Sequence, residues 1–111
     1  MAVGAILLSQ RFPLQGGHEW AWPFWVPRAG VLNVTTEGDL AHYAGVYTRD
    51  QYDRARASAP VRFPFLIGSA RLTHFLRYTI QGPGEYVIVV RVTSWAGLRT
   101  ASIQAVVQIA P

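Results

Sequence analysis

Residues 71–80 read RLTHFLRYTI and residues 100–109 read TASIQAVVQI, and in both segments apolar and polar side chains alternate. A period of two residues places the apolar side chains on one face of an extended chain, as in a strand with one buried face. Similar short segments occur elsewhere along the chain, separated by turns that contain Gly or Pro. This pattern predicts an all-β protein, a single antiparallel β-sandwich such as a jelly roll. In the first segment the predicted inward side chains are Leu72, Leu76, Tyr78 and Ile80.

About eight strands are predicted, and the 111 residues (1–111) are expected to form one domain. Residues 49–58 lack the period of two, and Asp50 is expected to cap a helical turn there. Both faces of 85–93 are apolar, so this segment is predicted to be a central strand covered on both sides. Pro23 and Pro64 cannot donate to a ladder, which places their strands at edges or bulges. The predicted strands are 2–9, 18–26, 31–37, 41–48, 61–67, 71–80, 85–93 and 100–109.

The composition limits the functions that the chain can have. With 50% hydrophobic and 14% charged residues it is too apolar for a disordered protein. It has no Cys, which excludes disulfides and thiolate metal sites. All 10 basic residues are Arg, so no P-loop lysine is present. The net charge of +4 permits an acidic partner without requiring one.

The opening MAVGAILLSQ has neither the basic start of a signal peptide nor the length of a membrane span. We therefore expect no signal peptide and no transmembrane segment, and a cytoplasmic or virion-associated location. Residues 2–8 are apolar on both faces. An exposed apolar terminal strand would promote aggregation, so we expect this strand to be covered by its own sheet or by a neighbouring subunit.

Three longer runs resemble a known type of domain: PFWVPRAGVLNVTTEG (23–38), VYTRDQY (46–52) and FLRYTIQGPGEYVIVVRV (75–92). Over about residues 20–110 they are similar to GOLD-like and bacterial pre-peptidase C-terminal-like small β-sandwich domains. This resemblance implies a GOLD-like sandwich and a non-catalytic binding or accessory module. We expect the chain to depart from those families by standing alone and by lacking a secretion signal.

No catalytic constellation is found in the sequence. Gly68-Ser69-Ala70 lacks the following Gly of a nucleophile elbow. The histidines His18, His42 and His74 have no metal-ligand spacing, and His74 is expected to be a hydrogen-bonded core or interface residue. We therefore predict no enzyme activity, no cofactor and no metal site.

Two acidic segments leave one alternative open. Oxygen ligands from both could converge on Ca²⁺. Ordinary turn and cap chemistry is the favoured interpretation, because Arg49 and Arg54 flank the second segment. The carboxylates concerned are Glu37, Asp39, Asp50 and Asp53.

The segment 18–27 is unusually aromatic. On a regular strand Trp20 and Trp22 share one face with Phe24, and Trp25 points the opposite way. These rings either fill the core or form an exposed aromatic edge. An exposed edge would serve subunit packing or would stack on a sugar ring.

A cluster of Arg residues is interleaved with Tyr47 and Tyr52. Arg and aromatic side chains together line single-stranded nucleic-acid grooves. Because carboxylates lie nearby in sequence, a solvated loop or a rim of inter-subunit salt bridges is favoured instead. The cluster consists of Arg49, Arg54, Arg56 and Arg62.

Together these patterns predict a non-catalytic structural or binding subunit of a homo-oligomer or larger assembly, such as a virion surface, capsid-decorating or filament protein. Self-association is expected, and other assembly proteins are further partners. The first alternative is a carbohydrate-binding module that uses exposed Trp residues. The second is a nucleic-acid binder that uses the Arg/Tyr segment, and it is not favoured. The candidate interface residues are Trp20, Trp22, Trp25, Arg49, Tyr52, Arg54 and Arg56.

Overall fold

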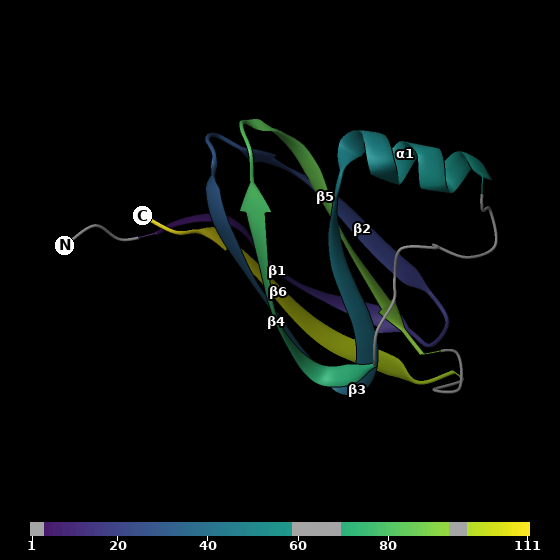
Figure 1. Ribbon diagram of the computed structural model, residues 1–111. Coiled ribbons are helices and arrows are strands. Elements are labelled where there is room, and N and C mark those ends of the chain that lie inside the picture. Colours follow the sequence, from purple (N-terminus) through teal and green to yellow (C-terminus); the bar gives the residue numbers. More distant parts are fainter. Residues whose placement is uncertain (1–3, 59–69, 94–97) are drawn as a thin grey trace.

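A computed structural model of the protein describes residues 4–58, 70–93 and 98–111 (Figure 1). Strands dominate these residues, so the all-β prediction is confirmed. The only helix in the described residues lies against one side of the sheet. The elements are β1 (Ala5–Gln15), β2 (Glu19–Val26), β3 (Gly30–Thr48), α1 (Arg49–Ser58), β4 (Arg71–Ile80), β5 (Gly84–Val92) and β6 (Thr100–Ile109).

The strands form one antiparallel sheet of six strands, in the order β1-β6-β3-β5-β2, with β4 paired to β3. The long strand β3 pairs first with β6 through Leu32–Gly38 and then with β5 through His42–Thr48. Between these stretches β3 bends, and its register with β4 shifts. The bend brings the end strands β1 and β2 toward each other, so the sheet is nearly closed.

This architecture corrects the predicted strand map. The segments 31–37 and 41–48 were expected to be separate strands, but they are the two arms of β3. The Glu37-Gly38-Asp39 sequence bends the strand and does not form a hairpin turn. Its glycine is needed because a Cβ at Gly38 would lie 2.4 Å from the Ile103 side chain. The predicted strand 61–67 lies outside the described residues. The hydrogen bonds of the described strands define one sheet of six strands, so the eight strands and two sheets of the predicted sandwich are not confirmed.

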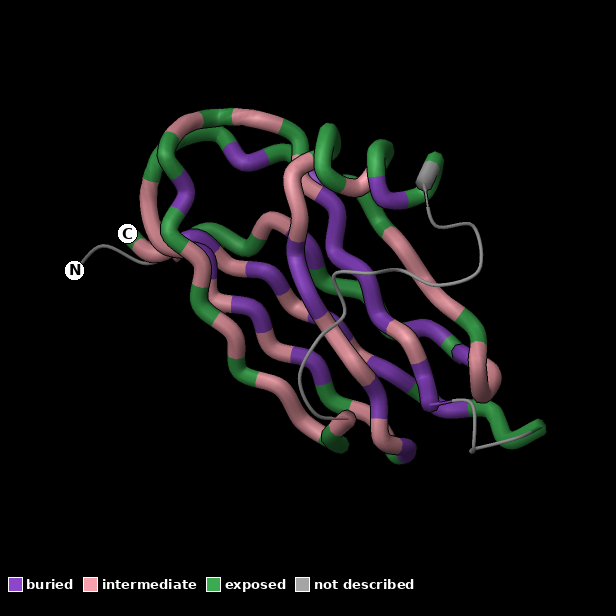
Figure 2. The backbone as a smooth tube through the Cα atoms, turned by 45° about the vertical axis from the view of Figure 1, so that its right-hand side comes forward, coloured by how far each residue is buried: buried purple, intermediate pink, exposed green. Residues whose placement is uncertain are grey.

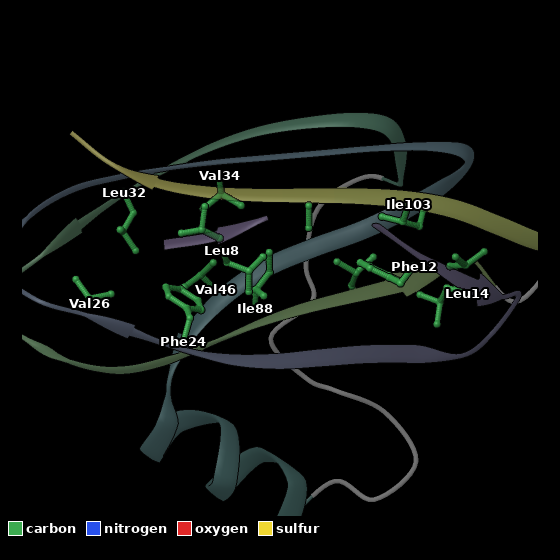
Figure 3. Close-up of a cluster of buried hydrophobic side chains, with 14 of the residues drawn as sticks. Leu8, Phe12, Leu14, Phe24, Val26, Leu32, Val34, Val46, Ile88 and Ile103 are labelled. Carbon is green, nitrogen blue, oxygen red and sulfur yellow. The ribbon is translucent and has the colours of Figure 1, made fainter. Parts of the chain in front are cut away.

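The core lies inside this rolled sheet, where side chains from opposite walls meet (Figure 3). In 100–109 the alternation is confirmed, since Ile103 and Val107 are buried and Ser102 is exposed. The core cluster contains Leu8, Phe12, Leu14, Phe24, Val26, Leu32, Val34, Leu40, Val46, Ile80, Ile88, Val90, Val92, Ala101, Ile103, Ala105, Val107 and Ile109.

Strand β5 is covered on both sides, as predicted for 85–93. Ile88 and Val90 face the core, while Val87 and Val89 pack under α1 in a second, smaller cluster with Ala55. Helix α1 extends the helical turn that was predicted at Asp50 over the whole of 49–58.

Strand β4 follows the alternation less completely. Ile80 is buried and Leu76 and Tyr78 pack against the core, but Leu72 is 55% exposed. The predicted inward face of this strand is therefore covered only toward its C-terminal end.

Candidate interaction surfaces

Strand β2 directs its aromatic side chains to both sides of the sheet. Trp20 packs against the core. Trp22 alternates with it on the same side but is 43% exposed, and the outward-facing Trp25 is 62% exposed. Both alternatives predicted for the aromatic segment are thus realised, the core by Trp20 and the surface by Trp25.

The gap between β1 and β2 is bridged by a row of stacked rings. Phe12 and Trp20 stack with centroids 3.8 Å apart and planes 12° apart. Trp20 and Trp22 continue the row at 5.9 Å and 15°. Trp22 ends this row with part of its ring in solvent. A flat ring in that position can stack on another ring of a ligand or a partner.

The α1 arginines pair with carboxylates of their own chain. Arg49 donates to Asp53 at 3.1 Å and to Glu85 at 3.2 Å. These pairs hold the start of the helix on β5, so α1 is positioned by charge as well as by its apolar side.

The other two arginines of the helix, Arg54 and Arg56, also pair with carboxylates of their own chain. Arg56 donates to Glu19 of β2 at 3.3 Å and lies over the ring of Tyr52, 5.9 Å from its centroid. Tyr52 itself packs against the cluster under the helix. Arg54 pairs with Asp50 one turn earlier. Arg62 lies outside the described residues.

The acidic residues considered for Ca²⁺ are separated in space. Asp50 and Asp53 belong to α1 and pair with arginines. Asp39 lies at the bend of β3, where it accepts a hydrogen bond from the Ser102 N–H at 2.8 Å. Within the described ranges no group of three or more His, Asp or Glu side chains is placed to hold a metal ion.

A buried histidine lies at the bend of β3. His42 is 0% exposed. Its Nδ1 lies 3.1 Å from the Leu40 carbonyl, which can only accept, so Nδ1 carries the proton and Nε2 accepts from Thr36 Oγ1 at 2.9 Å. Burial lowers the pKa of His42, and nearby His74 lowers it further, although the bond to Leu40 opposes this. The lowered pKa favours the neutral ring, and both of its nitrogens bond within the chain.

His74 supports the same region from β4. Its Nε2–H donates to the His42 carbonyl at 2.6 Å, and the two rings meet edge to face at 5.0 Å. The expectation of a hydrogen-bonded His74 is confirmed. Further along, the Val46 N–H donates to the Tyr78 hydroxyl at 3.2 Å. Where β4 and β3 diverge, side chains of β4 thus bond to backbone groups of β3.

Strand β4 is an interaction candidate that the alternation pattern did not single out. It pairs with β3 and with no other strand of the described chain, so its opposite edge is open there. Phe75 on this strand is 78% exposed, and Arg71 and Arg77 on either side are exposed too. The signal was present in RLTHFLRYTI, because Phe75 is a large apolar residue on the polar side of the alternation.

Described residues line two cavities of interest on the surface. One, of about 390 Å³, lies between the ends of β3 and β4 and is lined by Val46, Tyr78, Ile80 and Tyr86 among others. The other, of about 340 Å³, is polar and lies over the bend of β3 beside Arg11, Glu37 and Asp39. Neither contains a nucleophile paired with a base.

A comparison of the chain with models of known protein families gives no match, and a comparison with curated proteins gives none either. Among the described residues, no helix is long and apolar enough to cross a membrane.

Proposed function

We propose that this protein is a non-catalytic structural or binding subunit that associates with copies of itself, alone or within a larger assembly. A virion surface, a capsid or a filament is the setting that we propose for it. The observation that carries the proposal is strand β4, which pairs only with β3 among the described strands and has an exposed aromatic side chain at its centre.

An open strand edge presents unpaired N–H and C=O groups that can pair with another strand. Soluble proteins shorten, charge or cover such edges. Strand β4 carries arginines at Arg71 and Arg77, but it also exposes Phe75 and Leu72. Exposed large apolar residues on an edge are typical of a surface that a partner covers.

Two further observations support a binding role over chemistry. His42 is a buried titratable side chain, and both of its ring nitrogens form hydrogen bonds within the chain. The α1 arginines bond to carboxylates of the same chain, which gives little support to a nucleic-acid groove.

Sedimentation velocity over a concentration series tests the proposal. We expect a discrete oligomer, and we expect Phe75→Thr to shift it toward monomer without lowering the melting temperature. Leu98→Thr is the matched control, because Leu98 is 89% exposed but belongs to a turn and not to β4. A chain that stays monomeric at every concentration would overturn the proposal.

A second candidate function rests on the stacked row Phe12–Trp20–Trp22. Its half-exposed last ring is suited to stacking on a sugar, so carbohydrate binding is the alternative. Titration of oligosaccharides against Trp fluorescence tests it. Binding that Trp22→Ala abolishes and Trp25→Ala leaves unchanged would favour this alternative.

A further inference from the structure

We infer that β4 pairs with β4 of a second copy, antiparallel and about a two-fold axis at Phe75. The inference rests on the proposed self-association and names the surface and the register through which it occurs.

The pairing of β3 with its neighbours shows which backbone groups of β4 point away from β3, toward the edge that no other described strand pairs. The Val31 carbonyl accepts from the Ala110 N–H at 2.9 Å, so the backbone of Val31 faces β6. Successive residues of a strand face opposite edges, so Leu32 faces β4 and its partner Tyr78 faces β3. The residues that alternate with Tyr78 therefore face the open edge. They are Arg71, Thr73, Phe75, Arg77 and Thr79.

The side chains of these same residues lie on the outer face of the sheet. Leu76 is paired with Val34, which is buried in the core, so the neighbouring Phe75 and its partner Thr35 face outward. Phe75 is the central member of the row, and it is 78% exposed. A strand added at this edge would therefore meet Phe75 through both its backbone and its ring.

An antiparallel copy with the axis at Phe75 pairs every open residue of β4. Phe75 lies opposite the partner's Phe75, Thr73 opposite the partner's Arg77, and Arg71 opposite the partner's Thr79. The two phenyl rings form a cross-strand aromatic pair, and no Arg lies opposite an Arg.

Other symmetric registers are less favourable. Moving the axis to His74 places Arg71 opposite the partner's Arg77, and like charges in that position are destabilising. Moving it to Leu76 separates the rings and places Arg71 opposite the partner's Gln81, beyond the end of the strand. The register centred on Phe75 is therefore the one that the sequence of β4 favours.

Charge complementarity selects the same register. Glu37 on β3 is paired with Thr73, and it is exposed. The partner's Arg77 then lies in the same row as Glu37, two strands away, with about 10 Å between the backbones. The long Arg side chain can cross much of that span toward the carboxylate. In the two shifted registers Arg77 of the partner lies in a different row.

Spin labels measure the register directly. The chain has no Cys, so Thr73→Cys and Thr79→Cys each give one labelling site and leave Phe75 and both arginines in place. The axis at Phe75 separates the two labels of a pair along the strands by roughly 14 Å at position 73 and roughly 27 Å at position 79. A register shifted to His74 would give roughly 7 Å and 34 Å instead.

A charge swap tests the row that joins Glu37 to the partner. We expect Glu37→Arg and Arg77→Glu to weaken association several-fold each, and the double variant to recover it. Within one chain the two residues lie in different rows, so an effect on folding alone would not be rescued. If the parent protein without spin labels stays monomeric at every concentration, the proposed function is overturned. An oligomer with other label distances, or with no rescue, would overturn this inference and leave the proposed function standing.

Discussion

Helix α1 covers the outer face of β5 and β2, whereas in the described residues no helix covers the outer face of β6 and the first arm of β3 (Figure 2). Under the helix the outward residues are apolar, as at Val87 and Val89, and both are buried. On the bare half the outward residues of β6 are mostly polar, as at Ser102 and Gln104.

This difference shows that the outward residues of a strand are apolar where a helix covers them and mostly polar where none of the described helices does. A strand that is apolar on both faces needs a second layer, and the chain supplies it directly after β3 as α1. A strand that alternates can leave one face in water. Phe75 breaks this rule, because it is a large apolar residue on the bare half with no cover among the described residues.

The largest expected effect contrasts the outward valines of the two halves. Val89→Asp buries an unpaired carboxylate under α1 and should cost several kcal/mol, enough to prevent folding. Val106→Asp, outward on the bare half and partly exposed, should cost about 1 kcal/mol or less. Urea unfolding monitored by circular dichroism measures both. Equal losses of stability in the two variants would mean that burial under α1 does not set Val89 apart from Val106.

The next effect concerns the two tryptophans of β2. Trp20→Ala removes a ring from the core and from the stack with Phe12, and should destabilise by about 3 kcal/mol. Trp25→Ala should cost less than about 1 kcal/mol, because its ring is on the surface. If Trp25 also belongs to an interface, sedimentation velocity will show weaker self-association at nearly unchanged stability.

Much of this fold follows from local pattern. The alternation in 100–109 predicts β6 and its buried side, and the doubly apolar 85–93 predicts a central strand under a second layer. The aromatic segment 18–27 was correctly placed at an end of the sheet, because Pro23 cannot donate to an inner ladder.

What local pattern could not predict depends on long-range pairing. Glu37-Gly38-Asp39 has the composition of a turn, but it lies within β3, where Gly38 pairs with Ile103 of β6. Likewise the open edge of β4 depends on which strands β3 recruits, and the sequence of β4 does not contain that information. The α1 arginines were candidates for an interface because tyrosines are interleaved with them. Their pairing with Glu19 and Glu85 could not be predicted, because these carboxylates are distant in sequence.

An intermediate effect concerns acid stability at the bend of β3. Folding lowers the pKa of His42, so the folded state holds this proton less tightly than the unfolded chain. The stability that this provides is complete above the ordinary pKa of 6.5 and is lost as pH falls from there through the lowered value. Urea midpoints between pH 7.5 and 4.5 should therefore fall more for the parent than for His42→Gln.

The same site offers a matched test at neutral pH. Thr36→Val removes the hydroxyl that donates to His42 and leaves a buried acceptor without it, which should cost about 1–3 kcal/mol. An acid response that is identical in the parent and His42→Gln would assign the pH dependence to other groups.

The smallest expected effect concerns the ion pairs formed by the arginines of α1. Arg54 and Asp50 are both largely exposed and pair within α1, so Arg54→Ser should change stability by only a few tenths of a kcal/mol. Arg56 joins the helix to Glu19 of β2, whose side chain is only 18% exposed, so Arg56→Ser should cost more, up to about 1 kcal/mol. Urea unfolding measures the stability loss of each variant, and 0.5 M salt should narrow the difference between them because exposed charges are screened.

Sedimentation velocity on the double variant Arg54→Ser/Arg56→Ser then compares the two surfaces as interfaces. An oligomer that survives this double variant but not Phe75→Thr associates through the β4 side of the sheet. An oligomer that dissociates in the double variant with the fold intact uses the α1 arginines against a neighbouring subunit.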